Sequence, residues 1–255
     1  MKIIYWSDFN CPYSYIGYTR LKKAINELNL DVELDMKAFE LEQELDDEII
    51  PMVNHYARKY GIPEFQAKDM LKEIDDIGKA EGLDFDYSNA QITPSKDAHR
   101  LLKFAKSKNN SGLIENITVK LFEAFLCENK PLNSYEVLVD IGTSVGLDES
   151  EITNMLNSDS YAIEVQIDEE DGKLNGVQAV PCYFVENSEE MLVIPGALST
   201  EEFKNALKDL ESGEIESKTL WDVDNLKHFL NFKNKISFIN RGKWLLTSLS
   251  YETEF

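Results

Sequence analysis

The chain has 255 residues, 43% of them hydrophobic, so it can bury the core of one large domain or of two modest ones. Its 47 acidic residues against 26 basic ones give a formal net charge of −21, which argues against nucleic acid or an anionic membrane surface as a partner. The sequence has no run of about 18 apolar residues, and its opening residues lack a long apolar stretch, so we expect neither a membrane-spanning helix nor a signal peptide.

The chain opens with a strand, a helix and a second strand. Residues 1–7 include an apolar run that predicts a strand, and residues 12–29 repeat apolar side chains at helical spacing. Residues 32–36 alternate apolar and charged side chains, as a half-exposed strand does. Such a β-α-β unit indicates a crossover between two parallel strands.

Helical periods broken by turn residues follow from about residue 45 to residue 172. Within this segment, Thr93 and Pro94 suggest the N-cap and first position of a helix over residues 95–106. We therefore expect residues 45–172 to form an all-helical insertion domain.

Strand character returns at residues 180–185 and again at 191–196, with a polar turn between them, which predicts a β-hairpin. Ser199 and Glu202 have the spacing of a capping box at the start of a last amphipathic helix. The order β-α-β, helical insertion, β-β-α is that of an α/β thioredoxin fold. Residues 1–44 and 173–212 would form its core.

Residues 213–255 form a C-terminal extension rich in large apolar side chains, among them Trp221, Phe229, Phe238 and Trp244. The pattern suggests a short amphipathic helix and a hairpin. So much apolar surface is not typical of a disordered tail. We expect the extension to pack on the core or to lie at an oligomer interface, which makes a homodimer one of the expected states.

Cys11 lies at the junction between the first strand and the first helix, in the motif Cys11-Pro12-Tyr13-Ser14. The free N–H groups and the positive dipole end of a helix favour a thiolate, which predicts a lowered pKa and a nucleophilic sulfur. The alternative is a small buried apolar cysteine, as free cysteines commonly are. Three widely spaced cysteines make no disulfide framework, so a reducing cytoplasm is the expected location.

The chain resembles the DsbA-like thioredoxin-fold proteins of the FrnE type and their relatives, the hydroxychromene-carboxylate isomerases and kappa-class glutathione transferases. The stretches that carry this resemblance fall in order along the first 210 residues: 7–9, 11–17, 81–86, 97–102, 121–125 and 176–181. The resemblance implies thiol–disulfide chemistry at Cys11. FrnE-type proteins usually carry a second cysteine where this chain has Ser14, whereas the isomerases and transferases have serine in place of Cys11.

With one motif cysteine, a mixed disulfide at Cys11 would need an external thiol for its resolution, such as glutathione or another low-molecular-weight thiol. No tightly bound cofactor is expected. Ser14 lies one turn further along the helix and could donate its hydroxyl to the thiolate, or it could be an ordinary polar residue of a first helical turn.

The resemblance also implies the surroundings of Cys11. Val180-Pro181 corresponds to the family's cis-proline loop, and Phe9, Pro12, Tyr13 and His99 would bind the substrate or the thiol. A buried histidine and a trans proline at a strand start are the alternatives for His99 and Pro181. Cys182 is expected to pack in the core and Cys127 to be more exposed. The three histidines are too scattered to suggest a metal site.

Three functions follow as hypotheses. The first is a thiol–disulfide oxidoreductase acting on a thiol- or disulfide-bearing substrate through Cys11. The second is a glutathione-dependent isomerase or transferase of the hydroxychromene-carboxylate isomerase type. The third is a non-catalytic thioredoxin-fold adaptor that binds a partner.

Overall fold

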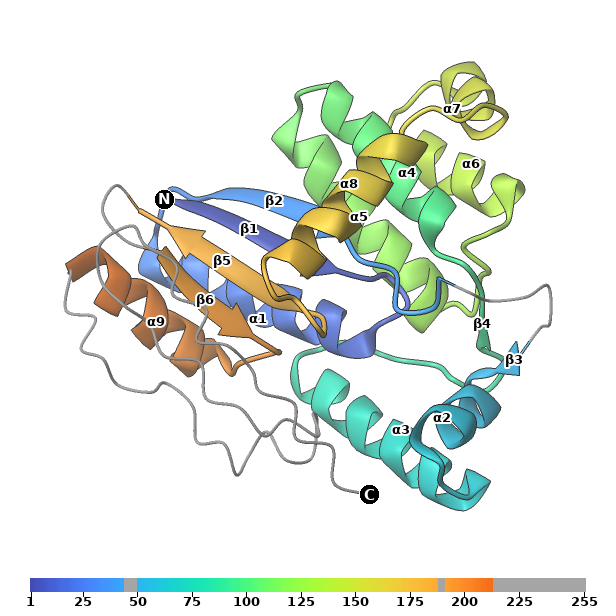
Figure 1. The fold of residues 1–255 in the computed structure, drawn as a ribbon, viewed down its shortest axis with the longest axis horizontal. Coiled ribbons are helices and arrows are strands. Elements are labelled where there is room, and N and C mark those ends of the chain that lie inside the picture. Colours follow the sequence, from blue (N-terminus) through green and yellow to red (C-terminus); the bar gives the residue numbers. More distant parts are fainter. Residues whose placement is uncertain (44–49, 188–190, 213–255) are drawn as a thin grey trace.

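The structure is a computed structural model that describes residues 1–43, 50–187 and 191–212. Its main sheet has the strand order β2-β1-β5-β6 (Figure 1), with these bounds: β1 (Lys2–Ser7), β2 (Glu33–Ala38), β5 (Cys182–Glu186) and β6 (Met191–Pro195). Strands β1 and β2 pair in parallel, and the β1–β5 and β5–β6 pairs are antiparallel. The expected parallel crossover and the expected hairpin are both confirmed, and so is the thioredoxin-like α/β fold.

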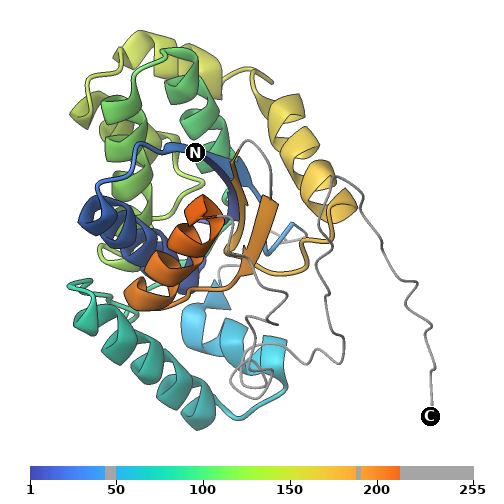
Figure 2. The same cartoon turned by 90° about the vertical axis from the view of Figure 1, so that its left-hand side faces the viewer.

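The two faces of the sheet bury different side chains because successive residues of a strand point to opposite sides. Ile3 and Tyr5 of β1 belong to the large core, whereas Trp6 belongs to a smaller apolar cluster on the other face. Figure 2 shows helices α1 (Pro12–Leu28) and α9 (Thr200–Ser212) on one side of the sheet and α8 (Ala162–Leu174) on the other. The sheet is therefore the middle layer of three.

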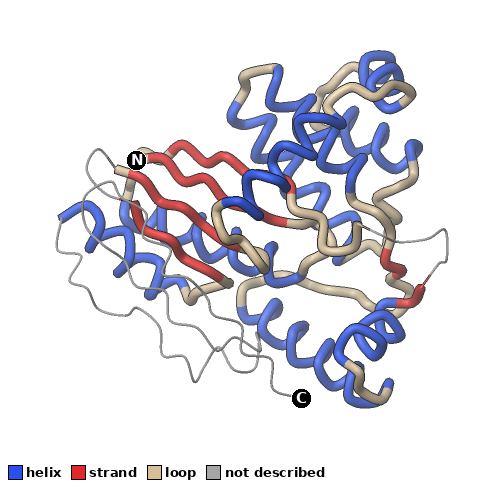
Figure 3. Tube along the Cα trace, in the orientation of Figure 1, coloured by secondary structure: helices blue, strands red, loops and turns tan. Residues whose placement is uncertain are grey.

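The segment between the two halves of the core is mainly helical, as the tube in Figure 3 shows. Its helices before α8 are α2 (Met52–Tyr60), α3 (Glu64–Ala80), α4 (Lys96–Ser107), α5 (Ser111–Leu126), α6 (Tyr135–Ser144) and α7 (Glu149–Leu156). The prediction of an all-helical segment was wrong in one detail. Two short strands, β3 (Ile50–Pro51) and β4 (Gln91–Ile92), pair antiparallel there. Two-residue strands are too short to show an alternating pattern in the sequence.

Helix α4 begins later than the sequence suggested. Its N-cap is Ser95 rather than Thr93, and Pro94 precedes the helix. The Thr93 hydroxyl instead accepts a hydrogen bond from the backbone N–H of Leu132 at 3.2 Å. The Thr93 side chain therefore bonds to a residue distant in the sequence instead of capping the helix, as the local pattern had suggested. The capping box of α9 is confirmed, because Glu202 N–H donates to Ser199 Oγ and Ser199 N–H donates to Glu202 Oε2.

One hydrophobic core joins the helical segment to the sheet. The buried residues of β1 and α1 and those of α3, α4, α5 and α6 form a continuous cluster. Asp168 of α8, 2% exposed, adds a polar connection: its carboxylate accepts from the backbone N–H of Ala38 at 2.9 Å and pairs with Lys37 and Lys103. Through Asp168, helices α4 and α8 are tied to the end of β2.

Two expectations from the sequence concerned the C-terminal extension and a membrane-spanning helix. The C-terminal extension, residues 213–255, lies outside the described residues. Among the residues that are described, no helix is both long enough and apolar enough to cross a membrane.

Candidate active site

Cys11 is the N-cap residue of α1, separated from β1 by residues 8–10. Its backbone is extended (φ −96°, ψ 111°), and Pro12 follows as the first helical residue. Proline suits this position because its missing N–H would have no partner within the helix. The Cys11 side chain is 6% exposed, and its thiol donates to the carbonyl oxygen of Val180 at 3.6 Å. Cys11 and Val180, which are 169 positions apart in the chain, are therefore in contact through the Cys11 sulfur.

The Val180–Pro181 peptide bond is cis, as the resemblance implied. The loop is held by a hydrogen bond from the Gly196 N–H to the Pro181 carbonyl at 2.7 Å. Gly17 of α1 faces this loop. A Cβ at Gly17 would overlap the Tyr183 hydroxyl and lie 3.1 Å from Pro181 Cγ. The lack of a side chain at Gly17 therefore lets α1 approach the cis-proline loop closely.

The expectation of a lowered Cys11 pKa was wrong in direction. Burial raises the pKa of the Cys11 thiol, and the negative charge of Asp8 raises it further. The Ser14 hydroxyl and the backbone N–H groups of Ser14 and Tyr13 act in the opposite direction but do not outweigh burial. The first turn of the helix therefore favours the thiolate, as predicted, while the lack of water around the sulfur favours the thiol.

Ser14 lies beneath Cys11 in the first turn of α1 and is 1% exposed. Its Oγ has no hydrogen-bond partner among the described residues, yet it lowers the pKa of Cys11 because it can donate to the thiolate. A buried hydroxyl without a partner is uncommon in proteins. Ser14 is thus placed to stabilise the charged form of Cys11 when that form appears.

Tyrosine side chains gather around Cys11. Tyr13 is half-buried and packs against the small apolar cluster that contains Cys11, Val180 and Cys182. Burial raises the pKa of Tyr13, and the nearby Cys11 raises it further. Nothing in the sequence indicated that Tyr56 and Tyr60 of α2 lie near Cys11. Burial is the main cause that raises their pKa values, and the charge of Cys11 raises both further. No signal in the local sequence connects α2 to the motif, because the contact is tertiary.

Phe9 and His99, which the resemblance suggested as substrate contacts, are both buried. Phe9 is fully buried and His99 is 1% exposed, with their rings 4.8 Å apart. His99 Nε2 lies 3.7 Å from Oδ1 of Asp8, a buried residue that sequence reasoning did not single out.

The other two cysteines make no disulfide with Cys11, since all three are free. Cys182 is buried, as predicted, and belongs to the same small apolar cluster as Cys11. Cys127 is half-buried at the end of α5, and burial raises its pKa to about 11. Burial raises the pKa of Cys182 as well.

A comparison with protein-family models matches residues 2–208 to the DSBA-like thioredoxin domain. The chain belongs to this family. The match covers the sheet, the motif of Cys11 and all of the helical segment, so the DsbA-like domain includes the insertion.

Solved structures show the same relationship for this DsbA-like chain. A probable DsbA oxidoreductase from Streptomyces coelicolor is 28% identical with a TM-score of 0.76, over 83% of this chain and 90% of that chain. The fold alone is shared with 2-hydroxychromene-2-carboxylate isomerase, with a TM-score of 0.59 and 16% identity over 85% of this chain and 100% of that chain. It is also shared with the cytosolic disulfide reductase DsbM from Pseudomonas aeruginosa (TM-score 0.55, 16% identity, 84% and 97% coverage). Members of this family are in general oxidoreductases or isomerases.

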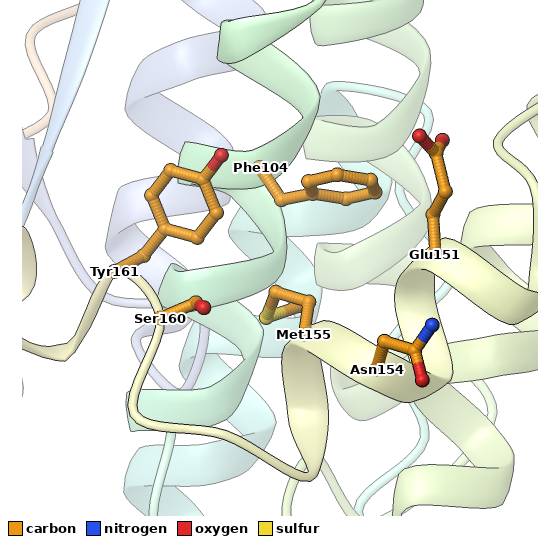
Figure 4. A pocket seen from close by; sticks show the side chains of 6 residues that line it. All are labelled: Phe104, Glu151, Asn154, Met155, Ser160 and Tyr161. Atoms are coloured by element: carbon orange, nitrogen blue, oxygen red, sulfur yellow. The ribbon is translucent and has the colours of Figure 1, made fainter.

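The DsbA-like domain has two surface hollows whose linings do not include Cys11. The one in Figure 4 has a volume of about 310 Å³ and lies where α4, α7 and the segment before α8 meet, lined by Phe104, Glu151, Asn154, Met155, Ser160 and Tyr161. The second, of similar volume, lies between the starts of α2 and α3 and residues 87–91. The second is lined in part by Tyr87, whose pKa is raised by burial and by the charges of Asp75 and Cys11. In the described parts of the chain, no group of three or more His, Cys, Asp or Glu side chains could hold a metal ion.

Proposed function

We propose that the protein is a thiol–disulfide oxidoreductase that works through Cys11 alone. The observation that carries the proposal is the meeting of the Cys11 sulfur with the Val180 carbonyl of the cis-proline loop. An extended disulfide-bearing chain could pair with the backbone of that loop and bring its sulfur to Cys11. Family membership supports the same reaction class.

The reaction has two exchanges. The Cys11 thiolate attacks one sulfur of a disulfide RS–SR′, so the Cys11–SR bond forms while the S–S bond breaks. R′S⁻ leaves with the electron pair and takes a proton from water. A second thiol R″SH then attacks the mixed disulfide as its thiolate, frees Cys11 and forms RS–SR″. In total R″SH is oxidised and the R′ sulfur is reduced.

The second thiol comes from solution, because Ser14 occupies the position where a resolving cysteine would stand. Glutathione, or another low-molecular-weight thiol, fits this role in a reducing cytoplasm. The DsbM structure from Pseudomonas aeruginosa has also been solved with GSH, which supports a glutathione-linked reaction on this fold. The charge of −21 argues against nucleic acid or an anionic membrane surface as a partner.

The test begins with mass spectrometry of the purified protein, where we expect a mixed disulfide on Cys11. Cys11→Ser should abolish the glutathione-dependent reduction of a model disulfide, whereas the control Cys127→Ser should keep it. Ser14→Cys should raise activity with a dithiol substrate, since it supplies a resolving thiol. Equal activity of the wild type and Cys11→Ser would refute the proposal.

A glutathione-dependent isomerase or transferase is the second candidate. It is favoured by the burial that raises the pKa of Cys11, because a neutral thiol in place of serine can donate a hydrogen bond to a bound thiolate. In this reaction Cys11→Ser should retain activity on a compact electrophile. The same variant therefore separates the two candidates.

A further inference from the structure

A phenol hydroxyl is buried where α1 meets the cis-proline loop. Tyr183 of β5 follows Pro181 closely in the chain and is fully buried. A Cβ added at Gly17 of α1 would overlap the Tyr183 hydroxyl and lie 3.1 Å from Pro181 Cγ. The hydroxyl therefore lies between α1 and the loop whose Val180 carbonyl accepts from the Cys11 thiol.

The Tyr183 hydroxyl has no hydrogen-bond partner among the described residues. Buried polar atoms are nearly always satisfied, so an exception needs a physical reason. The ring is held by its neighbours: it stacks on Tyr5 with the ring centroids 5.5 Å apart, and it meets the ring of Phe203 nearly at right angles at 5.2 Å. This packing fixes the oxygen atom, while the hydrogen can still rotate about the C–O bond.

Tyr183 keeps its proton while Cys11 ionises. Burial raises the pKa of Tyr183 well above its ordinary value, and the negative charge of Cys11 raises it further. Because the charge of Cys11 acts on Tyr183, the thiol is the group that ionises first. The phenol is therefore a neutral hydrogen-bond donor close to a sulfur that becomes negative.

We propose that Tyr183 is a positioning residue that acts through Cys11: its hydroxyl turns its hydrogen toward the sulfur as the negative charge forms and, together with Ser14, stabilises the thiolate. A donor that already had a partner would have to give up that bond, whereas this hydroxyl has none to lose. The proton that Cys11 loses goes to solvent, and the phenol keeps its own. The inference rests on the proposed function, because it concerns how the nucleophile of that reaction forms.

The charged and titratable groups that act on Tyr183 belong to α1 and β5, and the phenol of Tyr5 on β1 interacts with it as well. Cys182 of β5 is a thiol whose pKa burial raises to about 12, so it stays neutral while Cys11 ionises. The positive charge of Arg20 on α1 lowers the pKa of Tyr183, but by less than burial raises it. The negative charge that this hydroxyl can solvate is therefore that of Cys11.

Other groups act on Cys11 itself. After burial as the main cause, the negative charge of Asp8 raises the pKa of Cys11, whereas the Ser14 hydroxyl lowers it. The hydroxyl of Tyr87 also lacks a partner among the described residues, but Asp75 is the charge that acts on it most strongly. Further phenols that interact with Cys11 have raised pKa values and add no negative charge as it ionises: Tyr13, Tyr56 and Tyr60.

The experiment measures the rate at which iodoacetamide alkylates Cys11 over the neutral and alkaline pH range, followed on the Cys11 peptide by mass spectrometry in the full-length protein. Tyr183→Phe removes the hydroxyl and keeps the ring. It should raise the midpoint of the pH profile by about half to one pH unit, the contribution of one hydrogen bond of ordinary strength. Well below the midpoint, the same shift makes alkylation about three- to tenfold slower.

Tyr18→Phe is the matched control. Tyr18 is also buried, at 4% exposed, and its ring likewise stacks on Tyr5, at 6.2 Å. Burial and then the charges of Glu115 and Tyr15 raise the pKa of Tyr18, so loss of its hydroxyl should leave the Cys11 midpoint unchanged. The melting temperature at neutral pH is a second measurement. It should not fall in Tyr183→Phe, because a buried hydroxyl without a partner destabilises the thiol form.

Several outcomes would overturn the inference. One is a midpoint of Tyr183→Phe equal to that of the wild type, and another is an equal shift in Tyr18→Phe. A third is a lower melting temperature of Tyr183→Phe with alkylation slowed by the same factor at every pH, which indicates lost packing. Failure of Tyr183→Phe to fold, judged by circular dichroism, would show that the hydroxyl is structural. A wild-type Cys11 that is alkylated at no pH would instead refute the proposed function.

Discussion

At the residue scale, two opposite effects meet on the Cys11 sulfur. The start of α1 supplies N–H groups and a hydroxyl that stabilise a thiolate, and the surrounding apolar cluster removes the water that would solvate it. Burial is the larger effect, so the resting side chain is a thiol that donates to Val180. A substrate that enters the site must change this balance, and the Ser14 hydroxyl, which lowers the pKa of Cys11, can help it to do so.

Burial also raises the pKa of a carboxylic acid, the side chain of Glu40. Burial raises the pKa of Glu40 to about 7 from an ordinary value of 4.5, so the folded protein binds the proton more tightly than the unfolded chain does. The stability that this proton contributes is complete below pH 4.5 and is lost as the pH rises through about 7.

Glu40→Gln should therefore raise the melting temperature at pH 8, because the amide carries no charge to bury. The gain should diminish as the pH falls from about 7 toward 4.5 and vanish below it. Differential scanning calorimetry over this pH range measures the effect. Glu33→Gln, at an exposed position on β2, is the control and should show little change. A gain for Glu40→Gln that does not depend on pH would contradict the explanation.

At the scale of elements, the site depends on how closely α1 and α4 are held. Gly17 brings α1 against the cis-proline loop. Helix α4, which carries His99, is anchored by the guanidinium of Arg100, which donates to the carbonyls of Met155 and Ser160 at 2.7 and 2.8 Å. These contacts hold α1 against the cis-proline loop and α4 against α7 and the segment that follows it.

Gly17→Ala should destabilise the protein by about 1–3 kcal/mol, the usual cost of an added methyl group in a filled space. It should also slow alkylation or disulfide exchange at Cys11, because the loop and the helix must separate. Gly112→Ala is the matched control: it lies in the exposed first turn of α5, where a Cβ would meet only ordinary contacts. That control should be neutral or stabilising by a few tenths of a kcal/mol or more. Urea denaturation of both variants compares them directly, and equal stabilities would count against close packing at Gly17.

At the scale of the whole molecule, the insertion is part of the working unit. Its helices share one hydrophobic core with the sheet, and α4 and α8 join β2 through Asp168. The family match over residues 2–208 spans the same unit and ends within α9. Residues 213–255 add to it a segment that this match does not include.

Truncation after Ser212 tests the role of that segment. Its apolar residues, Trp221, Phe229, Phe238 and Trp244 among them, lead us to expect a lower melting temperature or a change of solution mass on removal. Calorimetry and light scattering measure these two quantities, and alkylation of Cys11 serves as the control because its site lies upstream. An unchanged melting temperature together with an unchanged mass would show that the extension is dispensable.

The order of the four main-sheet strands and the mainly helical character of the segment between them were determined by the sequence itself, because periodic apolar residues, turn residues and the Ser199–Glu202 capping box are local signals. The short strands β3 and β4 were not. The position of Cys11 at a strand-to-helix junction followed from the same signals, and the cis bond at Pro181 from the family resemblance. Only the tertiary structure decided that the Cys11 pKa is raised, that His99 is buried beside Asp8, and that α2 brings tyrosines to the site. The physical reason is that burial and charge depend on groups from distant parts of the chain, such as Val180, 169 positions from Cys11, which no local pattern reveals.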